Sequence, residues 1–188
     1  MSWVDSILSR GTRENARGVL VVFAVLFVVY ALVLVAATLV LQDPRILVVA
    51  RNAGPLENRW VAPGDVRTTL TALGDVGRTD LARSMIADVL YGAIFAFVLV
   101  TWIAYAVRRL RLEHTTTAPF LLLLPPLGAV ANVCEDVAVA RLVALYPEAP
   151  WSWVVMLDVS TVLKVLSGGL ALGAIIVLLA RRPPKPRT

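Results

Sequence analysis

Hydrophobic residues occur in four long blocks along this chain, and most of the charges lie between the blocks. A helix needs about 20 apolar residues to cross a bilayer, and each block is long enough to do so. The first block carries no charge and is longer than the roughly 7–15-residue apolar core of a cleaved signal peptide, so we expect it to remain as an anchor. The pattern predicts an all-α, polytopic membrane protein, a four-transmembrane-helix bundle with spans at about 19–41, 84–107, 118–145 and 153–180.

The connections between the blocks differ in length, and the longest, residues 42–83, is too long for a simple turn. Val66, Leu70 and Leu73 recur in it at helical spacing, which predicts a short amphipathic helix lying on the membrane. Residues 73–78 contain two glycines and predict a turn, after which Thr79 or Asp80 would cap the second span. Residues 3–8 carry one apolar face and predict another short helix at the interface.

Composition narrows the class of protein. Apolar residues make up 59% of the chain, charged residues only 16%, and the mean hydropathy is +0.78. A soluble domain has about 25% charged residues, so these values exclude an ordinary soluble enzyme, a disordered chain and a secreted disulfide scaffold. Residues 1–188 are expected to form a single membrane domain.

Several kinds of chemistry are excluded by what the sequence lacks. Cys134 is the single cysteine and His114 the single histidine, so neither an intrachain disulfide nor a histidine-based zinc site can form. The sequence contains neither a glycine-rich phosphate loop nor a serine-nucleophile motif. We therefore expect no metal and no cofactor.

Basic residues predict the orientation of the chain in the membrane. They precede the first block, follow the second and follow the fourth, where residues 181–188 form a basic tail. The positive-inside rule then places both termini in the cytoplasm. Sixteen arginines against two lysines suggest a GC-rich bacterial genome, and hence a multi-pass protein of the bacterial cytoplasmic (inner) membrane. Because the basic residues form short flanks, they fit anionic lipid headgroups and exclude a nucleic-acid partner.

Polar residues inside the blocks are the candidate functional residues. Asn132, Glu135 and Asp136 are spaced i, i+3, i+4 and share a helix face. Exposing such groups to lipid would cost several kcal/mol each, so we expect them to meet in a pocket in the outer half of the bilayer. The candidate catalytic residues are Glu135, Asp136, Asp88 and Lys164, and the candidate substrate-binding residues are Asn132, Tyr91, Asp158, Arg141 and Thr161.

The charges in this predicted pocket do not balance, since four carboxyl groups face one arginine and one lysine. Either a carboxyl group keeps its proton, or Arg78 or Arg83 folds in from the long loop, or a cation binds. Pro125 and Pro126 interrupt the third block, which indicates either a plain kink or freed carbonyls that line a cavity.

Three functions fit this pattern. In the first, the pocket binds or converts an apolar or amphipathic small molecule by acid–base chemistry, as an isomerase or cyclase does. In the second, the protein binds or carries protons or cations. In the third, the buried charges only hold the helices together, with Lys164 paired to Glu135 and Arg141 to Asp158 or Asp88, and the protein is an assembly subunit. The partners that fit are membrane lipids, an apolar or cationic small molecule, and a second copy or another membrane protein.

Several of these features together resemble an uncharacterised bacterial family of four-span membrane proteins, over residues of about 70–170. They are Leu73-Gly74-x-x-Gly77-Arg78, Asp88 before Tyr91, the acidic cluster of the third block, Tyr146-Pro147 and Lys164. Where that family has a D-x-x-E-N pattern, this chain has Asn132-x-x-Glu135-Asp136. The resemblance implies a four-span fold and no known activity. The arrangement is also loosely similar to the sterol-isomerase and sigma-2-type four-helix fold, whose acidic pocket binds cationic amphiphiles.

Overall fold

The computed structural model describes residues 3–39 and 62–183, with the side chains of residues 30–39 excepted. Within these residues the secondary structure is entirely helical, as the sequence predicts. Three of the helices, α5, α6 and α7, are long and apolar enough to cross a membrane. The elements in chain order are α1 (Trp3–Arg10), α2 (Arg13–Leu39), α5 (Pro63–Arg109), α6 (Thr117–Ala144) and α7 (Trp151–Ala180).

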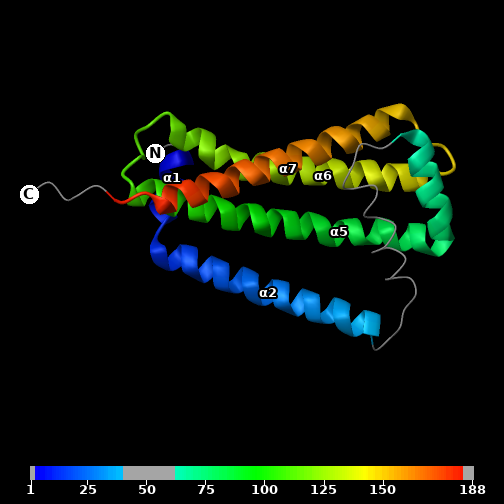
Figure 1. Cartoon of the computed structure of the whole chain (residues 1–188), viewed down its shortest axis with the longest axis horizontal. Helices are drawn as coiled ribbons and strands as arrows, with labels where there is room; N and C mark the ends of the chain where they lie inside the picture. Colours follow the sequence, from blue (N-terminus) through cyan, green and yellow to red (C-terminus); the bar gives the residue numbers. More distant parts are fainter. Residues whose placement is uncertain (1–2, 40–61, 184–188) are drawn as a thin grey trace, which may run out of the picture.

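Helices α5, α6 and α7 form a bundle in which α6 packs along both of the others (Figure 1). Helix α2 contacts α5 and diverges from the bundle toward Leu39 (Figure 1). α6 and α7 have nearly the bounds expected for the third and fourth spans, while residues 40–61 of the long loop and residues 184–188 of the tail lie outside the described residues. α1 is the short amphipathic helix expected at the N-terminus, and it packs on α5 through the buried Leu8.

Helix α5 contains the expected short amphipathic helix, with Val66, Leu70 and Leu73 on its buried face, and the helix expected to be the second span, joined by a kink at Gly74 instead of a turn over residues 73–78. It runs for 47 residues from Pro63, and its helical geometry is interrupted only at Gly74, with φ 64° and ψ −178°. Only glycine adopts this conformation readily, and one such residue is enough to bend the chain. The helix resumes at once, so Thr79 lies inside it and donates to the carbonyl of Asp75 (3.0 Å) instead of capping a new helix.

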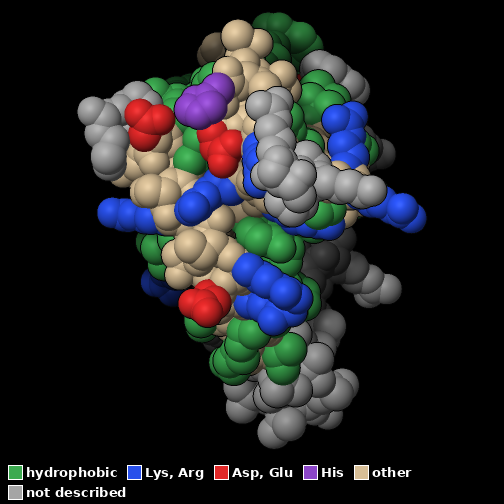
Figure 2. Space-filling model, turned by 90° about the vertical axis from the view of Figure 1, so that its left-hand side faces the viewer, with side chains coloured by type: hydrophobic (Ala, Val, Ile, Leu, Met, Phe, Trp, Pro, Cys, Tyr) green, Lys and Arg blue, Asp and Glu red, His purple; other side chains and the backbone are tan. Residues whose placement is uncertain are grey.

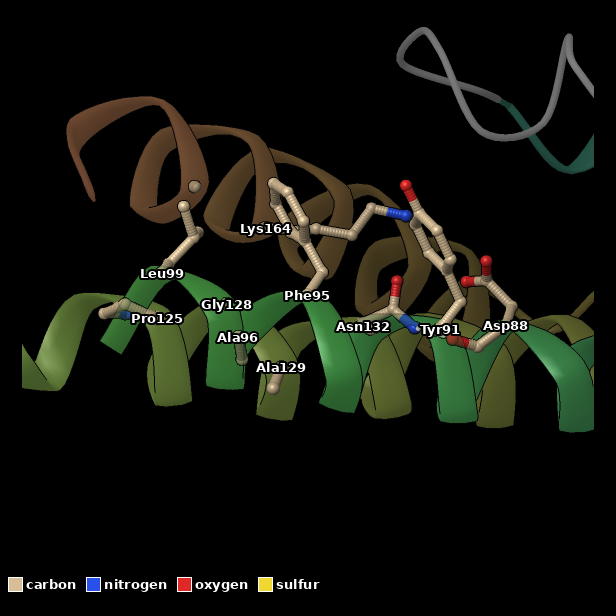
Figure 3. Close-up of a pocket in the computed structure, with 12 residues that line it drawn as sticks. Asp88, Tyr91, Phe95, Ala96, Leu99, Pro125, Gly128, Ala129, Asn132 and Lys164 are labelled. Atoms are coloured by element: carbon tan, nitrogen blue, oxygen red, sulfur yellow. Dashed lines mark hydrogen bonds between the residues drawn. The ribbon is translucent and has the colours of Figure 1, made fainter. Parts of the chain in front are cut away.

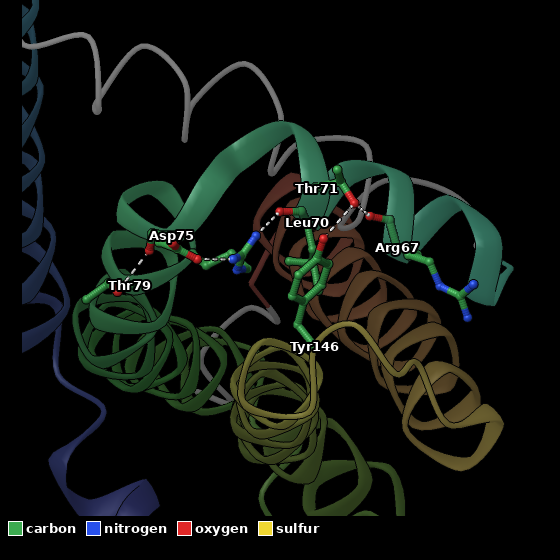
Figure 4. A network of polar contacts seen from close by, with 7 residues as sticks. Arg67, Leu70, Thr71, Asp75, Thr79 and Tyr146 are labelled. Carbon is green, nitrogen blue, oxygen red and sulfur yellow. Dashed lines mark hydrogen bonds and ion pairs between the residues drawn. The ribbon is translucent and has the colours of Figure 1, made fainter.

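The segment of α5 before Gly74 forms a cap across one end of the bundle. Its apolar face, Val66, Leu70 and Leu73, is buried against α6 and α7. Arg78 holds the bend, because its guanidinium donates to the carbonyl of Leu70 (2.8 Å) and forms an ion pair with Asp75 (Figure 4). The same guanidinium lies 3.9 Å from the centre of the Tyr146 ring. The Tyr146 hydroxyl is hydrogen-bonded to Thr71 (3.0 Å), which joins the cap to the α6–α7 turn (Figure 4).

Two apolar layers enclose a polar one. The layer beneath the cap contains Leu81, Leu142 and Leu157, and the layer at the opposite end contains Ile103, Leu122 and Ala171. Between them lie the buried polar side chains of α6 and α7: Asn132, Glu135, Asp136, Asp158, Ser160 and Ser167. The buried polar side chains of α6 and α7 are therefore concentrated in one middle zone between the two apolar layers.

Candidate functional site

A cavity of about 230 Å³ opens between α5, α6 and α7 in this middle zone (Figure 3). Its polar end is formed by Asp88 of α5, Asn132 of α6 and Lys164 of α7. Toward the other end the wall is apolar, with Phe95, Ala96 and Leu99 from α5 and Pro125 and Ala129 from α6 (Figure 3). The cavity is thus amphipathic along its length.

Lys164 reaches the cavity from α7 and is anchored on its other side by Glu135. The ammonium group forms an ion pair with Oε2 of Glu135, whose side chain is only 2% exposed. The other carboxylate oxygen, Oε1, accepts a hydrogen bond from the hydroxyl of Thr161 (2.6 Å). Glu135 and Thr161 therefore fix the position of Lys164, although neither residue lines the cavity.

Asn132 forms the polar floor of the cavity between α5 and α6. Its amide nitrogen donates to Oδ2 of Asp136 (3.1 Å) and to the backbone carbonyl of Asp88 (3.3 Å). The approach requires Gly92, because a Cβ atom there would lie 2.9 Å from the Asn132 amide nitrogen. Asp136 is 5% exposed and lies behind Asn132, away from the cavity lining.

Asp88 is the carboxylate that the cavity presents to a ligand. It lines the polar end, and within residues 3–39 and 62–183 its carboxylate is part of no hydrogen bond or ion pair. One turn along α5, Tyr91 lies beside it (Figure 3). The Tyr91 ring is 5.8 Å from that of Phe23 on α2 and 6.2 Å from that of Phe95, so three aromatic rings border this side of the site.

The structure places Arg141 and Asp158 away from the cavity. The Arg141 guanidinium lies 5.5 Å from the centre of the Trp153 ring, and no ion pair joins it to Asp88 or Asp158 in the described part of the chain. Asp158 is 6% exposed and belongs to the buried polar zone without lining the cavity. Arg78 and Arg83 also stay outside, since they pair with Asp75 and Asp80 near the cap.

The expected cluster is therefore divided into two layers. Asp88, Tyr91, Asn132 and Lys164 line the cavity, whereas Glu135, Asp136 and Thr161 support them from behind. Of the residues that the sequence did not single out, Phe95, Leu99 and Ala129 form the apolar wall. Pro125 also belongs to that wall, and the interruption of the third block by two prolines is the one signal that pointed to it. Helix α6 continues through both prolines.

The Lys164–Glu135 pair is the contact expected if the charges hold the helices together. That expectation leaves Asp88 unexplained, because its carboxylate joins no helix pair within the described residues. The site thus contains one ion pair that joins α6 to α7 and one carboxylate, that of Asp88, that lines the cavity.

Comparison of the chain with protein-family models, with curated proteins and with solved structures gave no match in any of the three. The resemblance noted in the sequence therefore stays a prediction.

Proposed function

We propose that this protein is a membrane protein that binds an amphipathic small molecule with a cationic or hydrogen-bond-donating head group. The observation that carries the proposal is the Asp88 carboxylate, which lines the polar end of a cavity whose remaining wall is largely apolar. A carboxylate in such surroundings is costly unless a partner neutralises it. A ligand with an amine head would supply the missing partner.

The shape of the cavity supports the same class of ligand. A volume of about 230 Å³ is large enough for a head group and a short apolar segment. The head group would lie between Asp88 and Asn132, and the apolar segment would run along Phe95 and Leu99. Tyr91, which is 42% exposed, would guide the rest of the molecule into the bilayer.

Acid–base conversion of the bound molecule is a second candidate, favoured by the presence of both Asp88 and Lys164 in the cavity wall. Asp88 would accept a proton from the ligand and Lys164 would orient or protonate it. Glu135 and Asp136 would act as positioning residues, because Glu135 holds the ammonium group of Lys164 and Asp136 holds the amide of Asn132.

For the membrane arrangement we propose four spans, with α2 as the first, and both termini in the cytoplasm of a bacterium whose inner membrane holds the protein. Three segments with many arginines support this topology, since they meet at the end of the bundle opposite the cap (Figure 2). Arg108 links two of them by donating to the carbonyls of Leu8 (3.1 Å) and Ser9 (2.8 Å). Arg109 links the third by donating to the carbonyl of Leu179 (2.9 Å).

The proposal is tested by thermal unfolding of the purified protein in nanodiscs, with octylamine, 1-octanol and octanoate as probes. We expect octylamine to raise the unfolding temperature, 1-octanol to raise it less and octanoate to leave it unchanged, because only the amine can pair with Asp88. In the Asp88→Asn variant the octylamine effect should disappear.

The matched control is Asp80→Asn, which removes a carboxylate two turns earlier on the same helix and outside the cavity. This variant should keep the full response to octylamine. Equal responses to all three probes would show that they act through the bilayer, and an unchanged octylamine response in Asp88→Asn would overturn the proposal.

A further inference from the structure

A second cavity, of about 280 Å³, lies at the arginine-rich end of the bundle. Val107, Leu112 and Leu121 form one side, and Val177 and Leu178 of α7 form the other. It is separate from the cavity at Asp88, since the two share no lining residue. Here we call it the arginine-end groove.

The arginine-end groove is lined at its base by buried residues and is open to the surface on one side. Val107 and Ala118 are at most 1% exposed and Leu178 is 6% exposed, whereas Val177, on the rim, is 54% exposed. The hydrogen bond from Arg109 to the carbonyl of Leu179 ties α5 to the last turn of α7 and holds the two sides of the groove together. An apolar chain that entered from the exposed side would contact Leu121, Val177 and Leu178.

The polar rim of the groove is cationic. Arg181 lines it together with Thr117, which brings a hydroxyl group, while the Thr115 hydroxyl already donates to the carbonyl of Leu112 (2.7 Å). The two segments that form the rim, residues 108–117 and 181–183, contain five arginines against the single carboxylate of Glu113. A guanidinium and a threonine hydroxyl are donors that suit a phosphate oxygen.

We propose that the arginine-end groove is a binding site for an anionic phospholipid, with an acyl chain against Leu121 and Val177 and the phosphate on Arg181. The charge of the rim selects the anionic head, and the apolar wall selects a lipid over a free anion. The groove lies where α5 and α7 end, which is the level of the headgroups if these helices cross the bilayer. The site complements the ligand cavity at Asp88 and does not depend on it.

Native mass spectrometry of the full-length protein tests this site. The probes are dioleoyl phosphatidylglycerol and dioleoyl phosphatidylcholine, which have the same acyl chains and differ in net charge. The wild type should retain the anionic lipid about fivefold better, the effect expected of one arginine near a membrane surface. Arg181→Gln should abolish this preference, and Ala174→Phe, which places a ring in the groove, should reduce retention of both lipids.

The matched control is Arg182→Gln, which removes the same charge from an exposed neighbour that does not line the groove. It should retain most of the preference. Equal losses in Arg181→Gln and Arg182→Gln would overturn the proposal by showing diffuse attraction to the whole end. Displacement of the lipid by millimolar inorganic phosphate would also overturn it, because the site would then bind the free anion.

Discussion

At the scale of single residues, Glu135 is a carboxylate that is almost completely buried inside the bundle. Its side chain is 2% exposed, and its two oxygens are used by Lys164 and Thr161 from a different helix. A buried charge pair gains little net stability over an apolar pair of the same size, but removing one member leaves the other charge uncompensated. The contribution of this pair therefore becomes visible only when its members are changed separately and together.

We predict that Lys164→Met destabilises the protein by about 3–5 kcal/mol, because the buried Glu135 carboxylate then has no counter-charge. The double variant Lys164→Met with Glu135→Gln should recover most of this loss, since it removes both charges. The free energy of unfolding, measured in mixed micelles, checks both statements. Additive effects of the two substitutions would show that the pair does not interact.

A control for loss of a cation is Arg141→Met. Its guanidinium lies over the Trp153 ring at 5.5 Å and is exposed, so the substitution removes only a cation–π contact worth about 0.5–1 kcal/mol. A loss as large as that of Lys164→Met would mean that the measurement responds to any missing positive charge.

The spacing correctly predicted that Asn132, Glu135 and Asp136 are buried on α6, but it did not show which neighbouring helix each side chain contacts, and Arg141, which was expected in the pocket, is exposed. Asn132 and Asp136 are four residues apart and differ by about 40° around the helix, whereas Glu135 is about 60° from Asn132 on its other side. This angle lets Asn132 bond to the α5 backbone while Glu135 meets α7. Spacing gives the angle, but only the packed bundle shows which neighbour each side of α6 faces.

At the scale of elements, Gly74 decides the shape of α5. Its φ of 64° and ψ of −178° belong to a region that is open almost only to glycine. A Cβ atom at this position would meet no heavy atom within 4 Å, so a substitution there is opposed by the backbone conformation alone. The bend directs Val66 and Leu70 onto the end of the bundle.

We predict that Gly74→Ala lowers the free energy of unfolding by about 1–3 kcal/mol, the cost of holding alanine in this conformation. Gly64→Ala is the matched control, because Gly64 lies in the first turn of the same helix, has open space around it and lacks a positive φ. Alanine there should be neutral or stabilising by up to about 1 kcal/mol. Equal effects of the two variants would contradict the role given to the bend.

The apolar pattern predicted both ends of α6 and of α7 to within two residues. It could do so because turn residues or charged residues mark where each apolar block stops. At the start of α5 the sequence predicted the short amphipathic helix and a break after it, but the break is the single residue Gly74 instead of a turn over residues 73–78 with a fresh cap at Thr79 or Asp80. Gly77 is helical and buried, and only Gly74 departs from helical geometry. Composition cannot distinguish a glycine that bends a helix from one that fits inside it, since the difference lies in tertiary packing.

At the scale of the whole molecule, the two ends of the bundle differ in charge, and only one of them is covered by the cap of α5. One end is covered by the α5 cap, with Arg78 paired to Asp75. Lys and Arg side chains gather at the other end (Figure 2). Arg10 in the last turn of α1, Arg108 in the last turn of α5 and Arg181 directly after α7 belong to this end. An asymmetry of this kind is what the positive-inside rule uses to orient a membrane protein.

We predict that the arginine-rich end faces the cytoplasm. Single cysteines in a Cys134→Ser background, read with a membrane-impermeant maleimide on intact bacterial spheroplasts, check this orientation. Positions at the cap end should be labelled in intact cells, and positions at the arginine-rich end only after the membrane is opened. The cap-end variants are Thr68→Cys and Ser152→Cys, and those at the opposite end are Ser9→Cys, His114→Cys and Arg182→Cys.

Ser9→Cys distinguishes a four-span chain from a three-span one. In the proposed four-span topology Ser9 and His114 lie on the same side of the membrane, because α1 is bound to Arg108, and α2 crosses the membrane to reach the cap end before α5 begins. Labelling of Ser9→Cys in intact spheroplasts while His114→Cys stays protected would contradict four spans. Labelling of both would reverse the orientation while leaving the bundle as described, and the arginine-end groove would then face the outer leaflet.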